Sequence, residues 1–110
     1  MSKKEIFNLI KTAGLEYKLN DIDKEIEYTM LMNDVYIEYI DKKYEDKLRD
    51  LELVHEVRRR MTNLLVIINK VNEIEEKAIA MNNHDLMWSC ESRKAKMINQ
   101  MEILRDKYEI

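Results

Sequence analysis

Residues 54–78 read VHEVRRRMTNLLVIINKVNEIEEKA, and this stretch decides the fold. Its apolar residues recur in alternating steps of three and four, which is the spacing of a coiled-coil seam. Seven of the eight seam positions are apolar, and the exception is Glu75. The seam positions are Val54, Val57, Met61, Leu64, Ile68, Val71, Glu75 and Ala78. The spacing predicts one long amphipathic helix over residues 51–82.

The composition of the whole chain also favours helices. Glycine occurs once, at Gly14, and proline is absent from the 110 residues. A β-rich domain needs turn residues at nearly every hairpin, whereas a chain of long helices needs few. Hydrophobic residues make up 45% of the chain and charged residues 37%, a mixture that argues against disorder. We therefore expect a single all-α domain over residues 1–110. It should be an antiparallel three-helix bundle or a long coiled-coil-like hairpin, with a short extra N-terminal helix.

The short N-terminal helix is predicted over residues 3–13. Ser2 and Glu5 form a candidate capping box before it, and Gly14 suits the left-handed residue that follows a helix end. A helix of this length is not stable alone, so its apolar face should pack on the rest of the fold. The residues of this face are Ile6, Leu9, Ile10 and Ala13.

A second helix is predicted over residues 21–46, with Asn20 or Asp21 as its N-cap. Its apolar residues again follow one helical stripe, and Asn33 interrupts that stripe where an apolar residue is expected. The apolar members of the stripe are Ile22, Ile26, Met30, Ile37, Ile40 and Tyr44.

The last helix is predicted over residues 85–109. Residues 81–85 read MNNHD, a turn in which asparagine tolerates the left-handed backbone and Asp85 can cap the following helix. Because this turn is short, the helices on either side of it should run antiparallel. The seam of the last helix contains Met87, Cys90, Lys94, Met97, Met101, Leu104 and Tyr108.

Residues 44–51 form the one joint that the pattern leaves open. The stripe of the second helix and the seam of residues 54–78 fall on different faces when they are extended towards each other. We favour a turn here, with Asp46 or Asp50 as the cap of the next helix. The alternative is a phase shift within a single helix of about 60 residues, which would project beyond its own core and need a partner chain.

Residues 64–68 read LLVII and are apolar all the way round the helix. A helix that is buried on one side does not need such a segment, so this helix should have neighbours on several sides. Some of those neighbours can come from a second copy of the chain. We therefore expect a homodimer, and the candidate self-association residues are Leu64, Leu65, Ile67 and Ile68.

Charge is unevenly placed along the chain. Residues 16–56 carry 13 acidic and 6 basic residues, whereas residues 57–110 carry 8 acidic and 10 basic residues. This asymmetry favours docking between oppositely charged faces, within one chain or between chains. The sharpest basic feature is the run of Arg58, Arg59 and Arg60. These arginines are candidates for partner binding or for pairing with the acidic segment, and their alternative role is nucleic-acid binding through phosphates.

No catalytic, metal or cofactor-binding site is predicted, and we do not expect an enzyme. Glu52 and His55 have the spacing that helical di-iron proteins use, but such a site needs the motif twice. Cys90 lies on an apolar seam, so we interpret it as a core residue. A single cysteine forms no internal disulfide, which fits a reducing compartment.

The predicted function is that of a small interaction module. We expect an adaptor, chaperone or inhibitor that docks a helical face on a partner protein of unknown identity. Tyr and Trp are enriched at interfaces, so Tyr36, Tyr39 and Trp88 join the three arginines as candidate partner-binding residues.

A small-ligand binder is the lowest-ranked alternative. It would use a pocket between the helices lined by the seam-breaking residues Asn33, Glu75 and Lys94.

The longest unbroken apolar run, residues 64–68, is too short to cross a membrane. We therefore expect a cytoplasmic protein with no membrane partner. Its 13 isoleucines, 13 lysines and 9 asparagines suggest an AT-rich genome, that of a bacterium or of a phage acting in its bacterial host.

Overall fold

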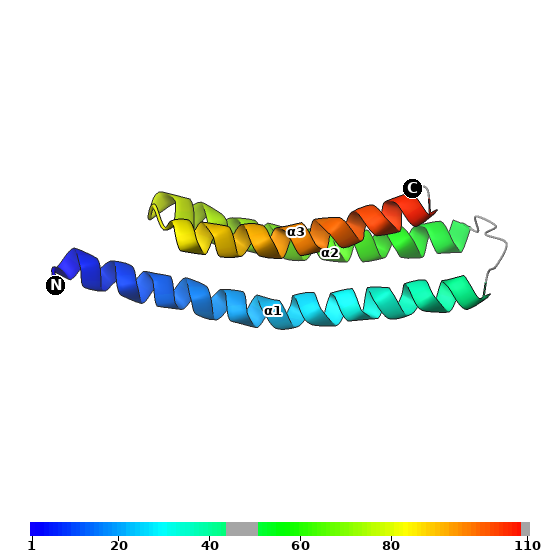
Figure 1. Cartoon of the computed structure of the whole chain (residues 1–110), viewed down its shortest axis with the longest axis horizontal. Helices are drawn as coiled ribbons and strands as arrows, with labels where there is room; N and C mark the ends of the chain where they lie inside the picture. Colours follow the sequence, from blue (N-terminus) through cyan, green and yellow to red (C-terminus); the bar gives the residue numbers. More distant parts are fainter. Residues whose placement is uncertain (44–50, 109–110) are drawn as a thin grey trace.

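Three long helices make up the protein. The computed structural model describes residues 1–43 and 51–108. Helix α1 spans Lys3–Lys43, α2 spans Leu51–Ala80 and α3 spans His84–Tyr108. The helices lie side by side in a molecule of 65 × 19 × 17 Å, and each runs antiparallel to the one before it (Figure 1). The predicted all-α, antiparallel three-helix bundle is confirmed.

The core lies between the seams that the sequence predicts. Burying each large apolar side chain contributes roughly 1.5–3 kcal/mol, so this shared interior is the main source of stability. The α2 seam supplies the buried residues Val57, Leu64, Ile68, Val71 and Ala78. The α3 seam supplies Cys90, Met97, Leu104 and Tyr108, and α1 supplies Leu15, Leu19, Ile26 and Ile40.

Helix α1 is continuous where the sequence predicts two helices. Ser2 Oγ accepts a hydrogen bond of 3.2 Å from the backbone amide of Glu5, as expected for the N-cap. The helix then passes through Gly14, so the predicted end there and the predicted caps at Asn20 and Asp21 are wrong. A glycine inside a helix costs only about 1 kcal/mol relative to alanine. The burial of nearby side chains such as Leu15 offsets that cost.

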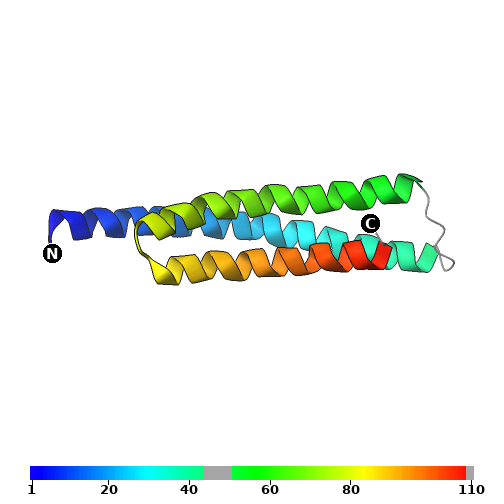
Figure 2. The same ribbon diagram turned by 90° about the horizontal axis from the view of Figure 1, so that it is seen from above.

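The first turns of α1 extend beyond the end of the α2–α3 hairpin (Figure 2). The predicted packing of the N-terminal apolar face on the rest of the fold is therefore wrong. Ile6, Leu9 and Ile10 are 46%, 57% and 65% exposed, and Ala13 is exposed as well. The reason is helical phase. Because α1 does not break at Gly14, Ile6 and Ile10 lie on the side opposite to its buried residues.

The turn between α2 and α3 uses the predicted asparagines. Asn82 has a φ of 55°, the left-handed conformation that asparagine tolerates. Asn83 Oδ1 accepts a hydrogen bond of 3.1 Å from the backbone amide of Leu86, so Asn83 is the N-cap of α3. The predicted cap, Asp85, lies instead in the first turn, where its charge favours the helix N-terminus.

The chain reverses direction between α1 and α2. The two helices lie side by side (Figures 1 and 2), and Lys70 Nζ lies 3.0 Å from Glu25 Oε1. The alternative of a single helix of about 60 residues is therefore wrong. The predicted caps Asp46 and Asp50 lie outside the described residues.

A buried polar cluster joins all three helices. Asn33 of α1 and Gln100 of α3 are 1% and 3% exposed. Asn33 Nδ2 donates a hydrogen bond of 2.9 Å to Gln100 Oε1, and Gln100 Nε2 donates to the carbonyl oxygen of Met30 at 2.9 Å. Arg60 of α2 donates to Asn33 Oδ1 at 3.2 Å. Each amide finds partners inside the bundle, so the cluster defines the rotation and height of every helix against the other two.

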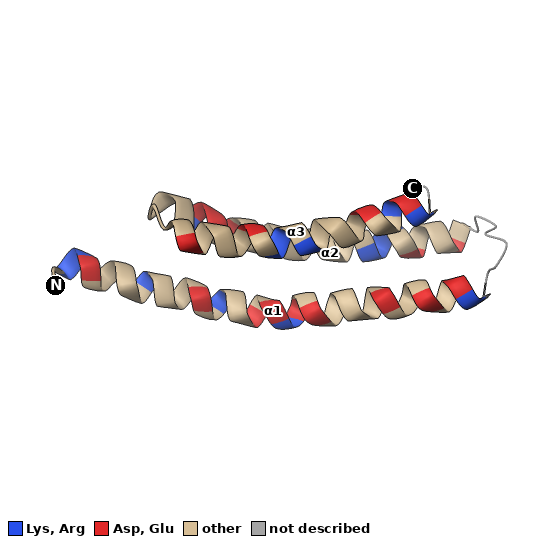
Figure 3. Cartoon of the chain, in the orientation of Figure 1, with Lys and Arg blue, Asp and Glu red and all other residues tan. Residues whose placement is uncertain are grey.

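Ion pairs at the edges of the core reinforce this arrangement. Arg93 of α3 makes two hydrogen bonds to Asp23 of α1, at 2.6 and 2.9 Å. Lys107 Nζ lies 2.7 Å from Asp41 Oδ2 on α1. Acidic residues are frequent along α1, and α1 supplies the carboxylates of both ion pairs (Figure 3). The predicted pairing between the acidic and basic segments thus occurs within the chain.

Replacing Gln100 with alanine should destabilise the bundle. The change leaves the amide of Asn33 buried without its acceptor, which costs about 1–3 kcal/mol. Denaturant unfolding followed by circular dichroism measures the loss. Asn99→Ala is the matched control, since Asn99 is the exposed amide one position earlier in α3. It should change the free energy of unfolding by less than about 0.5 kcal/mol, and equal losses in the two variants would contradict the role of the cluster.

Candidate interaction surface

Helix α1 carries a second line of apolar residues on the face that points away from α2 and α3. We call it the outer stripe. Its apolar members step by three and four along the helix, and Asp21 and Lys24 interrupt it near the middle. The apolar members are Ile6, Ile10, Ala13, Tyr17, Tyr28, Leu31, Val35 and Tyr39. All of them are exposed, and the seven large ones are 46% to 76% exposed.

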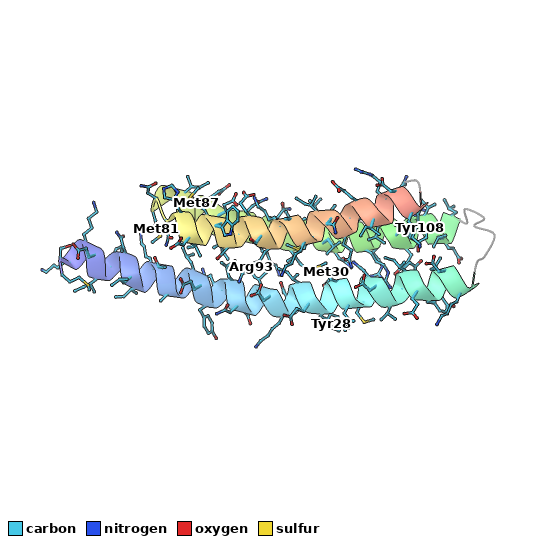
Figure 4. All side chains as sticks on the ribbon, in the orientation of Figure 1. Tyr28, Met30, Met81, Met87, Arg93 and Tyr108 are labelled. Atoms are coloured by element: carbon cyan, nitrogen blue, oxygen red, sulfur yellow. The ribbon has the colours of Figure 1, made fainter. Side chains whose placement is uncertain are left out.

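Simple helix geometry explains why the outer stripe faces solvent. Each residue advances about 100° round an α-helix, so residues nine apart lie on opposite sides. Val35 follows the buried Ile26 by nine residues, and Ile10 precedes the buried Leu19 by nine. Tyr28 accordingly points away from the α2–α3 hairpin, whereas Met30 points towards it (Figure 4). Helix α1 is therefore apolar on two opposite faces, and its own bundle uses one of them.

Our prediction from the sequence missed the outer stripe, although a signal for it is present. Ile6, Tyr17, Tyr28 and Tyr39 recur at intervals of eleven residues. Eleven residues are close to three turns of an α-helix, so such a series runs nearly parallel to the helix axis. The predicted helix end at Gly14 divided this series between two helices and hid its period.

The outer stripe is long for an exposed apolar surface. Its members span residues 6–39, a length of about 50 Å at ~1.5 Å per residue. Soluble monomers rarely expose long contiguous apolar patches, and those that do commonly use them to bind proteins. Three tyrosines lie on the stripe, and tyrosine is enriched at protein interfaces.

The predicted aromatic candidates lie on different surfaces. Tyr39 belongs to the outer stripe and is 52% exposed. Tyr36 is half-buried and lies under Arg60, whose guanidinium is 4.1 Å from the ring centre. Trp88 is 75% exposed, but it lies on α3. The structure therefore brings Tyr36 together with Arg60 and leaves Trp88 apart from the outer stripe.

The three consecutive arginines have three different environments. Arg59 donates hydrogen bonds of 2.6 and 3.0 Å to Glu56, and these bonds lower the pKa of the Glu56 carboxyl. Arg60 reaches Asn33 in the buried cluster, and its Nε lies 3.0 Å from Glu56 Oε1. Arg58 is exposed and forms no ion pair with any described residue. Among the described residues, Arg58 is thus the member of the run that has no ion pair.

Most of the candidate self-association residues lie in the core of a single chain. Leu64, Ile67 and Ile68 are buried by the bundle itself, whereas Leu65 is 47% exposed. The neighbours that residues 64–68 need on several sides are supplied by α1 and α3. Self-association through this segment would rest on Leu65 and on the adjacent Val66, which is 50% exposed.

The seam-breaking polar residues are each bonded to another helix of the bundle. Lys94 Nζ donates a hydrogen bond of 2.9 Å to Glu75 Oε1, and this bond raises the pKa of Lys94. Asn33 belongs to the separate cluster with Gln100 and Arg60. The three residues that were candidates for one ligand pocket therefore belong to two separate sets of hydrogen bonds between helices.

Cys90 is completely buried, as its position on the α3 seam predicts. Burial raises the pKa of its thiol. Among residues 1–43 and 51–108, no group of three or more His, Cys, Asp and Glu side chains is placed to hold a metal ion. The same part of the chain contains no helix that could span a membrane.

No family model matches this sequence, and comparison with curated proteins and with solved structures gives no match either.

Cys90 should react very slowly with a thiol reagent such as DTNB at pH 8. The thiol is buried and its raised pKa lowers the thiolate fraction, so reaction has to await opening of the bundle. For a domain with an unfolding free energy of about 5 kcal/mol, the rate should be ~10³-fold or more below that of the unfolded chain. The same protein in denaturant is the control. Reaction at the same rate with and without denaturant would contradict the core position of Cys90.

Proposed function

We propose that this protein is a small non-enzymatic interaction module that docks the outer stripe of α1 on another protein. The observation that carries the proposal is the exposure of that stripe along nearly the whole of α1. An adaptor, a chaperone and an inhibitor all act in this way. The composition of the chain supports a setting in the cytoplasm of a bacterium, or of a bacterial host if a phage encodes the protein.

No member of the outer stripe belongs to the buried core that residues 1–43 and 51–108 form. Leu15, Leu19, Ile26 and Ile40 supply the buried face of α1, and the outer stripe lies on the other side. Covering an exposed Leu, Val or Tyr contributes up to roughly 1.5–3 kcal/mol per side chain. Several such side chains in one line supply enough free energy for association, and this supports a binding role.

The shape of the stripe restricts the kind of partner. A straight line of apolar residues on a helix fits a complementary helix or a groove between helices. Asn33 is bonded to Gln100 and Lys94 to Glu75 inside the bundle, which favours a binding role over a small-ligand site between the helices.

Nucleic-acid binding through Arg58, Arg59 and Arg60 is the second-ranked function. The ion pairs of Arg59 and Arg60 with Glu56 weigh against it, because they leave Arg58 as the exposed arginine without an ion pair among the described residues. Binding to heterogeneous DNA or RNA that weakens steeply with salt would favour this function. Absence of binding at low salt would exclude it.

The double variant Leu31→Glu/Val35→Glu should weaken partner binding strongly while leaving the fold intact. Both side chains lie on the outer stripe, 60% and 51% exposed, so two carboxylates would have to be desolvated in any complex. Affinity capture from native host lysate, quantified by mass spectrometry, should identify specific partners of the wild type. The variant should capture about tenfold less of each partner, or still less, which corresponds to a loss of ~1.4 kcal/mol of binding free energy.

Ile98→Glu/Ile103→Glu is the matched control, with two aliphatic residues on α3 that are 45% and 47% exposed. It should capture the same proteins as the wild type. Thermal unfolding should show comparable stability for both variants, since exposed substitutions change it by about 0.5 kcal/mol or less. If the outer-stripe variant captures everything that the wild type does, the proposed surface is wrong.

A further inference from the structure

We propose that the outer stripe is occupied by the α1 helix of a second copy of the chain, packed antiparallel about a two-fold axis near residues 22 and 23. The inference rests on the proposed function, because it names the partner of the same surface. The axis falls close to the middle of α1, which spans Lys3–Lys43, so the two helices would overlap along almost their whole length.

The two charges in the outer stripe are placed for this pairing. When two identical helices pack antiparallel about a point between residues 22 and 23, residue n lies opposite residue 45 − n of the other copy. Asp21 then faces Lys24 of the partner subunit, and the symmetry repeats the pair. Both side chains are exposed, and neither forms an ion pair with another described residue of its own chain. The one polar interruption of the stripe becomes two complementary ion pairs.

The apolar members of the stripe match in the same register. Tyr17 lies opposite Tyr28 of the partner subunit, and Ile10 lies opposite Val35 of the partner subunit. Ile6 lies opposite Tyr39 of the partner subunit. Each of these layers joins two large exposed side chains, so one register buries the stripe from end to end.

Gly14 provides a second and independent observation. A Cβ added at this position would meet nothing within 4 Å, so the glycine is not required by contacts within its own chain. Its φ is not positive, so backbone conformation does not require it either. In the antiparallel pairing, the small Ala13 and Gly14 lie opposite the larger Leu31 and Met32 of the partner subunit. A small residue there lets the other helix approach closely, which accounts for a glycine inside a helix.

Other arrangements of the same two stripes are worse. In a parallel in-register pair, Asp21 would lie beside Asp21 of the partner subunit and Lys24 beside Lys24 of the partner subunit. An antiparallel pair shifted by one heptad would place Asp21 opposite Leu31 or Tyr17 of the partner subunit, burying a charge against an apolar side chain. At the ends of the proposed pair, Lys3 meets Lys42 of the partner subunit. Both lysines are exposed there, and Lys42 is bonded to Glu38 at 3.1 Å, so repulsion is weak.

The expected interface is narrow. A contact strip about 50 Å long and roughly 10 Å wide covers on the order of 1,000 Å² over both chains, which is the lower end for a specific complex. We therefore expect dissociation constants on the order of micromolar, and the test has to reach protein concentrations well above that.

A charge-swap experiment tests the pairing. Sedimentation equilibrium should show a dimer for the wild type at about 10–200 μM, a range set by the narrow interface. Asp21→Lys and Lys24→Asp each replace two attractive pairs with two repulsive ones, and each should weaken the dimer about tenfold. The double variant Asp21→Lys/Lys24→Asp should restore wild-type affinity. An equimolar mixture of the two single variants should form a heterodimer, because their altered charges then complement each other.

Cysteine cross-linking tests the direction of the helices. A mixture of Tyr17→Cys and Tyr28→Cys chains should form a disulfide-linked heterodimer under mild oxidation. Neither variant alone should form a disulfide-linked homodimer. In the antiparallel pair, the cysteines of two identical chains would lie eleven residues apart along the helices, about 16 Å, which is too far for a disulfide. The native Cys90 is buried and does not compete. Cross-linking of Tyr17→Cys to itself would indicate parallel helices and overturn the proposal.

The remaining outcomes separate this proposal from the proposed function. The wild type could be monomeric at about 200 μM, well above the expected micromolar dissociation constant. If Leu31→Glu/Val35→Glu nevertheless loses its lysate partners, a different protein binds the outer stripe. The proposed function then holds and the proposed dimer is wrong. If the wild type is monomeric and the variant loses no partner, both proposals are wrong. A third outcome is that the wild type dimerises, the charge variants dimerise equally well, and Leu65→Glu abolishes the dimer. In that case the dimer forms through α2, and the proposed pairing of α1 is wrong. Circular dichroism of every variant confirms that the monomer fold is intact.

Discussion

The hydrogen bond of 2.9 Å between Asn33 and Gln100 determines how α1 is rotated on the α2–α3 hairpin. Hydrophobicity alone does not decide this, because α1 is apolar on two opposite faces and either could cover the hairpin. Only the inner face carries an amide that can bond to Gln100 and Arg60 inside the core. Turning α1 by half a revolution would bury Asp21 and Lys24 and leave the amide of Gln100 unpaired, which is costly in a dry interior. The bonds of Asp23 to Arg93 and of Glu25 to Lys70 favour the same rotation.

This choice of rotation also creates the surface on which the proposed function rests. Once the inner face of α1 is buried, the large apolar side chains of the outer stripe remain 46% to 76% exposed. Its members then point away from the α2–α3 hairpin, and under the proposed function another protein would cover them and gain the free energy of their burial. A polar cluster that specifies the fold thereby selects the surface left for binding, so the interior and the proposed interface are two consequences of one constraint.

Residues with a simple local signal were predicted well. The seams of α2 and α3, the left-handed asparagine of the turn and the buried position of Cys90 all follow from periodicity and from turn chemistry. The errors share a cause. Gly14 was interpreted as a helix end because glycine suits the left-handed residue that follows a helix, yet the roughly 1 kcal/mol cost of a helical glycine is small beside the burial of Leu15 and Leu19. From that error followed the wrong orientation of the N-terminal face and the failure to recognise the outer stripe.

The sequence by itself determined that the chain is helical, where the long amphipathic segments lie and that α2 and α3 form an antiparallel hairpin, because these features depend on contacts between residues close along the chain. Only the tertiary structure decided that α1 is one continuous helix and which of its faces is buried. Those outcomes depend on contacts between distant residues. The burial of Leu15 and Leu19 outweighs the local preferences of Gly14 and Asn20, and the bonds of Asn33 with Gln100 and of Asp23 with Arg93 select the buried face. Periodicity identifies the apolar faces of a helix, but it cannot choose between two such faces on the same helix.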